Sequence, residues 1–394
     1  MRRRRVVYLG HTAVLSGGEL ALLRLLPHMT DIEAHVLLGE DGPLVERLKA
    51  RRVAVEVLPF APSARTLHRR EVGLGTVLAH GLPVGAYIVQ LMGRLRRLRP
   101  DLVHTNSLKA GLYGSVAARA VGVPVVWHLR DRISEDYLPS AAVRGVRLAL
   151  AHLPTAVIAN SKATLETAGN VRRGSVVHDP CDLRPVTRER APGEPLTVGI
   201  IGRLAPWKGQ HLFLDAFARA FPGGNERALI VGSPLFGEVD YEASLRRQAV
   251  ELGLGARVCF TGFREDVASE LGRMDVLVLA STIPEPFGQV VVEGMAAGLP
   301  VVAPSAGGPA EVIDDGRSGL LYRLGDADAL ATLLQRLSRR PDHREQLSRA
   351  AAAAAERFRP PGIAAQMIDR YIAVLDQGRH RRFMGASARR RRSS

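Results

Sequence analysis

Short apolar runs alternate with longer amphipathic stretches along most of the chain. In the first half the runs that predict buried strands are Val6–Leu9, His35–Leu38, Val53–Leu58, Leu102–His104, Val123–Trp127 and Ala156–Ala159. Between them, residues 18–28, 83–99 and 108–121 have apolar positions three and four apart, as on one face of a helix. The helix over 83–99 is expected to end at Pro100, where the next strand begins.

A break follows at residues 179–195, which are rich in proline and charge. The alternation then starts again, with strands expected at Leu196–Ile201, Ala228–Val231, Val258–Thr261, Val276–Ala280 and Val301–Ala303. Helices are expected at residues 209–220, 240–253, 265–273, 288–298 and 326–339. A last amphipathic segment, Pro361–Leu375, stands apart from this pattern.

This order of elements predicts an α/β protein with two Rossmann-like, doubly wound parallel sheets that face a central cleft. In such sheets ligands bind beyond the carboxyl ends of the strands. We expect one domain over residues 1–185 and a second over 186–360. Residues 361–378 are expected to form a C-terminal helix, and residues 379–394 a basic disordered tail.

The 394 residues are 46% hydrophobic, which is typical of a globular protein of two domains. No window approaches the roughly 20 apolar residues that a membrane helix needs. The basic N-terminus is followed by too short an apolar run for a signal peptide, so a first strand is expected there. Cys181 and Cys259 have no zinc-type or disulfide spacing. A cytoplasmic location is therefore expected.

The net charge of +15 is unevenly distributed. Residues 1–5 have four arginines and residues 379–394 have seven, whereas residues 6–190 have a net charge of +8 and residues 191–378 of −4. No aromatic residues are interleaved with the basic ones, so we expect no nucleic-acid partner. The tails and the basic edge Arg94–Arg99 have two interpretations: they are solvated, or they make peripheral contact with a membrane.

The sequence Gly202-Arg203-Leu204-Ala205-Pro206-Trp207-Lys208-Gly209 leaves a predicted strand and enters a predicted helix. The start of a helix has unpaired N–H groups that favour anions. The guanidinium of Arg203 and the ammonium of Lys208 are suited to add two positive charges for a diphosphate. By itself this stretch is equally consistent with solvated charges beside a tight turn.

A second motif is Glu285-Pro286-Phe287-Gly288, with Glu293 eight positions after Glu285. Glu293 should lie about one turn into the following helix, where its carboxylate is placed to accept hydrogen bonds from a ribose diol. A third glycine-rich turn, Gly307-Gly308-Pro309, again follows a strand. Taken one at a time, acidic residues at helix starts are ordinary capping features.

Together these motifs resemble the retaining family 4 glycosyltransferases of the GT-B fold. Residues 196–325 match that family almost continuously, including the run from Val290 to Ala303 and the turn Gly307–Glu311. In the first half, Gly17-Gly18-Glu19 resembles the loop that closes over the donor phosphates. Trp127-His128-Leu129-Arg130-Asp131 and Asn160-Ser161-Lys162 also look similar. The chain departs from the family at 178–182, where the usual Asn-Gly turn is absent.

The resemblance implies a role for each matching residue. Arg203 and Lys208 would hold the diphosphate and stabilise the leaving group, Glu293 would bind the ribose, and Glu285 would lie near the sugar hydroxyls. His128 would stabilise positive character at the anomeric carbon or bind the sugar's hydroxyls. The implied donor-binding set is Gly17, Gly18, Arg203, Lys208, Phe287, Gly288 and Glu293, and the implied catalytic set is His128, Glu285, Arg203 and Lys208.

The resemblance implies a nucleotide-sugar donor, with UDP favoured, and neither a cofactor nor a metal. The basic first half favours an acceptor that is anionic or lipid-linked, and a small-molecule acceptor remains open. The last helix resembles the one that crosses back to the first domain. A GT-B-fold epimerase and a non-catalytic sugar-nucleotide-binding protein remain alternatives. A nicotinamide oxidoreductase is disfavoured because no Gly-x-Gly-x-x-Gly follows the first strand.

Overall fold

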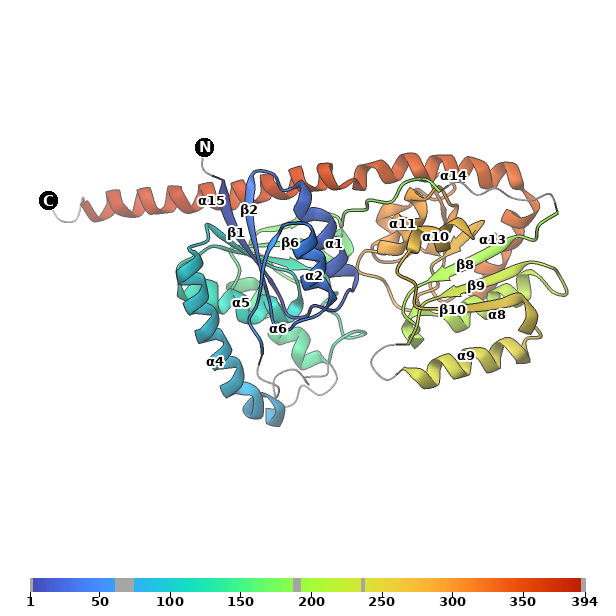
Figure 1. Cartoon of the computed structure of the whole chain (residues 1–394), viewed down its shortest axis with the longest axis horizontal. Helices are drawn as coiled ribbons and strands as arrows, with labels where there is room; N and C mark the ends of the chain where they lie inside the picture. Colours follow the sequence, from blue (N-terminus) through green and yellow to red (C-terminus); the bar gives the residue numbers. More distant parts are fainter. Residues whose placement is uncertain (1–2, 61–73, 187–192, 235–237, 391–394) are drawn as a thin grey trace. The chain divides into compact units, whose positions relative to one another are not determined.

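A computed structural model describes residues 3–60, 74–186, 193–234 and 238–390, and for residues 74–82 and 377–390 it describes the backbone alone. The chain forms two compact units, which are described separately (Figure 1). The first unit contains the chain up to Pro180 and again from Pro360 onward, and the second contains Cys181–Arg359.

The first unit is built on a seven-stranded sheet with the strand order β3-β2-β1-β4-β5-β6-β7. Adjacent strands run parallel, for example β1 with β2 and with β4. The strands are β1 (Arg4–Gly10), β2 (Ile32–Leu38), β3 (Ala54–Val57), β4 (Leu102–Thr105), β5 (Val125–Leu129), β6 (Ala156–Ala159) and β7 (Gly174–Val176). The order changes direction at β1, which is the feature that places ligand sites in doubly wound sheets.

The helices of this unit cover both faces of its sheet. They are α1 (Gly17–Leu25), α2 (Pro43–Ala50), α4 (Leu74–Leu98), α5 (Leu108–Ala120), α6 (Ser140–His152), α7 (Lys162–Thr167) and α15 (Pro360–Arg390), with a 3₁₀ turn at Leu26–His28. Strand β1 shows how the two faces are divided. Val6 and Tyr8 lie in a core with α1, α2 and α15, whereas Val7 and Leu9 lie in another with α4 and α5.

Helix α15 returns from the second unit to the first, where it lies beside α1 (Figure 1). Its residues Ile363, Met367 and Tyr371 follow one another at four-residue intervals and are fully buried in the first unit's core. The C-terminal segment is therefore part of that core. The helix continues to Arg390, where the sequence predicts disorder from residue 379. Alanine and arginine favour helix, and no proline interrupts the segment after residue 361.

The second unit is built on a six-stranded parallel sheet with the strand order β10-β9-β8-β11-β12-β13. Its strands are β8 (Thr197–Ile201), β9 (Arg227–Val231), β10 (Val258–Gly262), β11 (Val276–Val278), β12 (Val301–Pro304) and β13 (Leu320–Tyr322). Its helices are α8 (Gln210–Ala220), α9 (Val239–Glu251), α10 (Val267–Gly272), α11 (Gln289–Ala296), α12 (Pro309–Val312), α13 (Ala327–Arg339) and α14 (Pro341–Ala355). Three 3₁₀ turns complete it, at Pro206–Lys208, Gly255–Arg257 and Glu356–Phe358.

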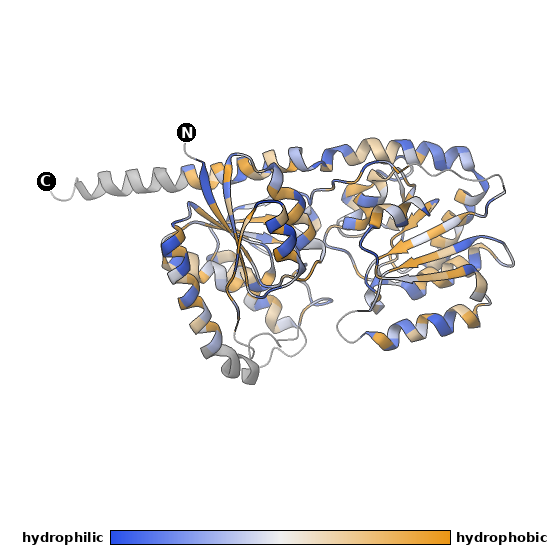
Figure 2. Cartoon of the chain, in the orientation of Figure 1, coloured by the Kyte–Doolittle hydropathy of each residue, from blue (hydrophilic) through white to orange (hydrophobic). Residues whose placement is uncertain are grey.

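Apolar side chains again fill both faces of this sheet. Val198 and Ile200 of β8 pack with helices α8, α9 and α13, and Leu277 and Leu279 pack with α11 and α14. Figure 2 shows hydrophobic residues concentrated in the strands and hydrophilic ones along the outer helices such as α14. The prediction of two parallel, doubly wound sheets is therefore confirmed.

Candidate functional site

In the second unit, the glycine turn at Gly209 holds the predicted diphosphate loop against the end of β11. Gly209 ends the 3₁₀ turn Pro206–Lys208 with φ of +71° and is followed by helix α8. A Cβ at this position would lie 1.8 Å from the carbonyl oxygen of Ala280, so both space and backbone conformation require glycine. The Thr282 N–H donates to the Trp207 carbonyl at 2.8 Å. The loop from 203 to 208 is thereby fixed beside the segment that leads to Glu285.

The third glycine turn contacts the Glu285 segment directly. The Gly308 N–H donates to the Glu285 carbonyl at 3.0 Å, and a Cβ on Gly307 would lie 2.3 Å from that same oxygen. A Cβ on Gly308 would lie 2.3 Å from the Cα of Phe287. The three glycine-rich turns that the sequence singled out therefore meet at the carboxyl ends of β8, β11 and β12.

Lys208 and Glu285 form the polar centre of this region. The Lys208 Nζ lies 2.5 Å from Oε1 of Glu285, and the Ser281 hydroxyl donates to the same oxygen at 2.5 Å. The Lys208 ammonium also lies 4.3 Å from the centre of the Trp207 ring, a cation–π contact. The sequence motifs predicted both residues, and the structure brings them into contact.

Arg203 also lies near the Trp207 ring. Its guanidinium carbon is 5.7 Å from the centre of that ring, and its Nε is 3.4 Å from Oε2 of Glu238. The Gln210 side chain donates to the Arg203 carbonyl at 2.9 Å, which ties this loop to the first turn of α8. Two cations therefore lie near one indole ring at the start of a helix, an arrangement suited to a diphosphate.

The other predicted donor-binding residues of this unit lie on helix α11 or just before it. Gly288 is the residue that precedes α11, with φ of +84°, and Glu293 lies in the second turn, with 6% of its surface exposed. The ring of Phe287 is 2% exposed and packs edge-to-face on Phe358, 5.8 Å between centres. Because that ring belongs to the core, only the Phe287 backbone is available to a ligand.

In the first unit, the predicted glycine loop is the beginning of helix α1. Gly17 and Gly18 are the first two residues of α1, not part of an extended loop, because Ser16 already has the extended backbone of a helix N-cap. A Cβ on Gly18 would lie 3.0 Å from Cδ of Arg130, whereas Gly17 faces open space. Gly18 therefore leaves room for an arginine of another segment.

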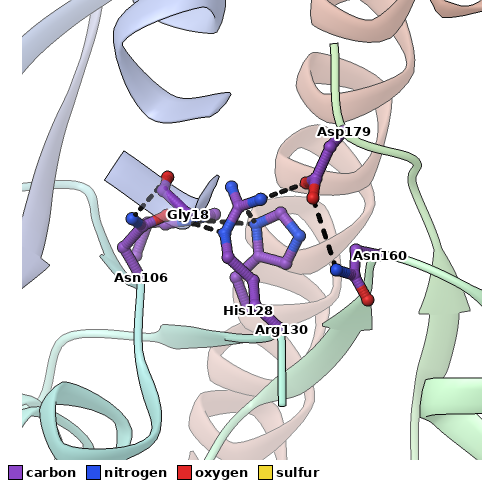
Figure 3. A network of polar contacts seen from close by, with 7 residues as sticks. Gly18, Asn106, His128, Arg130, Asn160 and Asp179 are labelled. Carbon is purple, nitrogen blue, oxygen red and sulfur yellow. Dashed lines mark hydrogen bonds and ion pairs between the residues drawn. The ribbon is translucent and has the colours of Figure 1, made fainter. Parts of the chain in front are cut away.

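Arg130 is the centre of a buried polar network (Figure 3). Its guanidinium is ion-paired with Asp179, and both side chains are less than a tenth exposed. It also donates through Nε to the Asn106 Oδ1 at 3.1 Å, and Asn106 in turn donates to the Gly18 carbonyl at 3.1 Å. The Asn160 side chain donates to the second Asp179 oxygen at 3.3 Å. The network holds the end of the first unit, at Asp179, against the strand ends.

His128 lies on β5 within reach of the same network. It is 1% exposed, and its Nδ1 is 3.4 Å from the Arg130 NH2 and 3.3 Å from the His104 Nε2. Burial, with the nearby positive charge of Arg130, lowers the pKa of His128 well below its ordinary value. The imidazole is therefore neutral at physiological pH.

The sequence motifs did not reveal the partners of these residues. Asp179 lies 49 positions from Arg130 and falls where the chain departs from the family pattern, and Tyr371, which bonds to His104, is 267 positions away from it. The sequence signal for this network was the presence of Arg130 and Asn160 inside matched motifs. Among the residues that the structure describes, no three His, Cys, Asp or Glu side chains gather in a way that would hold a metal ion.

Comparison with known proteins identifies the class that this fold and site define. Residues 187–354 match the family of glycosyl transferases group 1, and residues 43–183 match glycosyltransferase family 4. A D-inositol 3-phosphate glycosyltransferase of Streptomyces scabiei is 28% identical over 393 residues, 87% of each chain. A GDP-mannose-dependent alpha-mannosyltransferase of Mycobacterium tuberculosis is 31% identical over 284 residues, which cover 66% of this chain and 71% of the relative.

A solved structure resembles the chain over nearly its whole length. The Anabaena protein Alr3699/HepE, in complex with UDP and glucose, is 30% identical, with a TM-score of 0.81 over 94% of this chain and 100% of that one. Its complex with UDP-glucose gives a TM-score of 0.80 at 29% identity, over 94% and 99% of the two chains. The chain belongs to the glycosyl transferases group 1, and its two parallel-sheet units are those of the GT-B fold.

Proposed function

We propose that this glycosyltransferase is a retaining, metal-independent hexosyltransferase that uses a UDP-sugar as donor. The observation that supports it most is the cluster at the strand ends of the second unit, where Arg203 and Lys208 both lie near Trp207 beside the first turn of α8. The complexes of the Anabaena protein with UDP and UDP-glucose favour UDP over GDP for this chain. A relative that is a GDP-mannose-dependent alpha-mannosyltransferase makes GDP the alternative to be tested.

In the proposed reaction, Arg203 and Lys208 stabilise the negative charge that develops on the departing diphosphate. The bond between the anomeric carbon and the diphosphate oxygen breaks, and the electron pair stays on the diphosphate. The acceptor oxygen forms its bond to the same face of that carbon, and its proton passes to the leaving diphosphate. Glu285 is held by Lys208 and Ser281, so we assign it to orienting the ammonium and binding the sugar, not to nucleophilic attack.

The remaining roles in the proposal come from the family resemblance. Glu293 binds the ribose of the donor, the turns at Gly17–Gly18 and Gly288 approach the donor through their backbones, and His128 contacts the transferred sugar. The acceptor is a glycan, a lipid-linked sugar or a small molecule. The net charge of +8 over residues 6–190 favours an anionic one.

A donor screen tests this proposal. Purified protein is incubated with UDP-glucose, other UDP-sugars, GDP-mannose and ADP-glucose, with EDTA present throughout, and release of nucleoside diphosphate is measured with and without candidate acceptors. We expect UDP release that depends on the acceptor and is unaffected by EDTA. The anomeric proton coupling of the product then gives the stereochemistry. Turnover of no nucleotide-sugar, or conversion of a nucleotide-sugar into its epimer, would contradict the proposal.

A further inference from the structure

Three buried rings of the first unit form a continuous line of hydrogen-bonding groups. The Tyr371 hydroxyl lies 2.8 Å from Nδ1 of His104, and Nε2 of His104 lies 3.3 Å from Nδ1 of His128. All three residues are buried, and the two histidine rings meet edge to face. Tyr371 comes from α15, His104 from β4 and His128 from β5. The last atom in the line, Nε2 of His128, is buried and has no hydrogen-bond partner among the residues that the structure describes.

Arg130 determines which nitrogen of His128 is protonated, and so the direction in which the three residues donate their hydrogen bonds. A guanidinium has only N–H donors, so an arginine nitrogen beside an imidazole nitrogen requires that nitrogen to be an acceptor. The Arg130 NH2 lies 3.4 Å from Nδ1 of His128, which is therefore the unprotonated nitrogen. A neutral imidazole has one proton, so in His128 it is on Nε2.

The same reasoning fixes the other two members. Because Nδ1 of His128 accepts, Nε2 of His104 must be the donor between the two rings. Burial lowers the pKa of His104 to about 3, so this ring is neutral too and its Nδ1 has no proton. Tyr371 then donates its single hydroxyl proton to that nitrogen at 2.8 Å and not to the Tyr8 hydroxyl, which is farther away at 3.4 Å. The hydrogen bonds are therefore donated in one direction, from Tyr371 to His104 and from His104 to His128.

We propose that Tyr371 and His104 are positioning residues that hold His128 with its proton on Nε2, so that His128 offers a hydrogen-bond donor to an oxygen atom of the bound nucleotide-sugar. This inference rests on the proposed function for the identity of the ligand. A buried N–H without a partner costs about 1–3 kcal/mol, and a ligand oxygen removes that cost. An N–H is also directed at lone pairs and away from a positively charged anomeric carbon, so His128 binds oxygen and does not act as a base.

The tautomer is measured directly on the ligand-free protein. Two-bond proton–nitrogen correlation spectra of the full chain, labelled with ¹⁵N-histidine, distinguish a protonated Nε2 from a protonated Nδ1, and a His128→Gln variant assigns the signals. We expect His128 and His104 both to have the proton on Nε2. A protonated Nδ1 in His128 would overturn the inference. This measurement needs no substrate, so it stands even if the chain turns over no UDP-sugar.

Steady-state kinetics test whether the hydrogen bonds from Tyr371 to His104 and from His104 to His128 contribute to turnover. Tyr371→Phe removes only the hydroxyl, and His104→Leu removes both nitrogens. We expect each to lower kcat/KM for the UDP-sugar about tenfold, the effect of one hydrogen bond, with binding of UDP alone unchanged because UDP lacks the transferred sugar that His128 contacts. His104→Gln should restore most of the loss, because its amide nitrogen can donate to His128 while its oxygen accepts from Tyr371.

The matched control is Tyr8→Phe. Tyr8 is also fully buried, its ring lies 5.1 Å from that of His104, and its hydroxyl lies 3.4 Å from that of Tyr371 and is hydrogen-bonded to neither histidine. We expect Tyr8→Phe to retain the wild-type kcat/KM and the wild-type histidine tautomers, whereas Tyr371→Phe should give a mixture of tautomers at His104. Equal losses in Tyr371→Phe and Tyr8→Phe, or in His104→Gln and His104→Leu, would contradict a positioning role.

Discussion

Lys208 is one of the two cations assigned to the donor diphosphate, and its own surroundings make it a suitable residue to remove. It is one-fifth exposed, on a 3₁₀ turn at the surface of the second unit. Lys208→Ala should lower turnover of the UDP-sugar by a factor on the order of 100 to 1,000, because fixed charge at a departing group lowers the barrier most. Steady-state kinetics, UDP titration and circular dichroism measure turnover, binding and folding in the same sample.

Lys49→Ala is the control for Lys208→Ala. Lys49 forms an exposed ion pair with Glu46 at 2.8 Å in the first unit, and such pairs contribute about 0–1 kcal/mol to stability. We expect its kinetics to equal those of the wild type. If Lys208→Ala also had wild-type kinetics, Lys208 would not hold the diphosphate.

His104 should make the stability of the first unit depend on pH. Burial lowers its folded-state pKa to about 3, whereas an unfolded histidine has a pKa near 6.5. The unfolded chain therefore binds the extra proton, and stability that is present above pH 6.5 is lost as the pH falls toward 3. Between pH 6.5 and pH 5 this single group should cost about 2 kcal/mol. Urea unfolding at pH 7, 6 and 5 should show a shallower decline for His104→Gln, and parallel curves would contradict the neutral, buried ring.

At the scale of elements, the contact between α5 and β5 is close enough to exclude a single methyl group. A Cβ on Gly111 of α5 would lie 1.9 Å from the Trp127 ring of β5, which is fully buried next to His128. Gly111→Ala should therefore lower the free energy of unfolding by about 1–3 kcal/mol. Gly93→Ala in α4 has open space around it and should raise stability by about 0.5–1 kcal/mol. Urea midpoints that moved the same way in both variants would contradict this packing.

The sequence predicted most strands because strands buried on both faces of a parallel sheet need continuous apolar runs. Strands β7 and β13 were not predicted: each has three residues and lies at the edge of its sheet, where the apolar requirement is weakest. In the candidate site, Lys208 and Glu285 were predicted because their motifs are local. The Arg130–Asp179 pair and the Tyr371–His104 contact join segments far apart in sequence, and no local spacing indicates them.

At the scale of the whole molecule, the first unit needs the C-terminal helix α15 in order to fold. Ile363, Met367 and Tyr371 of α15 are each at most 1% exposed, and a fully buried apolar side chain contributes about 1.5–3 kcal/mol. A chain ending at Arg359 should lose the folded first unit and keep the second. Trp127 and Trp207, one in each unit, report the two transitions by fluorescence. A chain ending at Gly378 is the control and should unfold like the full chain; a first unit that stayed folded without α15 would contradict the prediction.

The exposed basic residues should attract the chain to anionic membrane surfaces. No helix in the described part of the chain is long and apolar enough to cross a membrane. Arg94 is ion-paired with Glu56, but Arg96, Arg97 and Arg99 are exposed, and residues 379–394 contain seven arginines. Each arginine near an anionic bilayer adds about 1 kcal/mol of attraction. The full chain should therefore sediment with vesicles that contain phosphatidylserine, and not with neutral ones.

Two variants separate the contributions of the tail and of the helix edge to this attraction. The chain ending at Gly378 removes the seven C-terminal arginines and should lose most of the vesicle binding, because that segment contains no acidic residue to offset them. Arg96→Gln combined with Arg97→Gln should weaken binding by a smaller amount. Raising the salt concentration to about 0.5 M shortens the screening length and should release the full chain. Equal, negligible sedimentation with anionic and neutral vesicles at low salt would show that the acceptor, if it is lipid-linked, is reached without an electrostatic hold on the membrane surface.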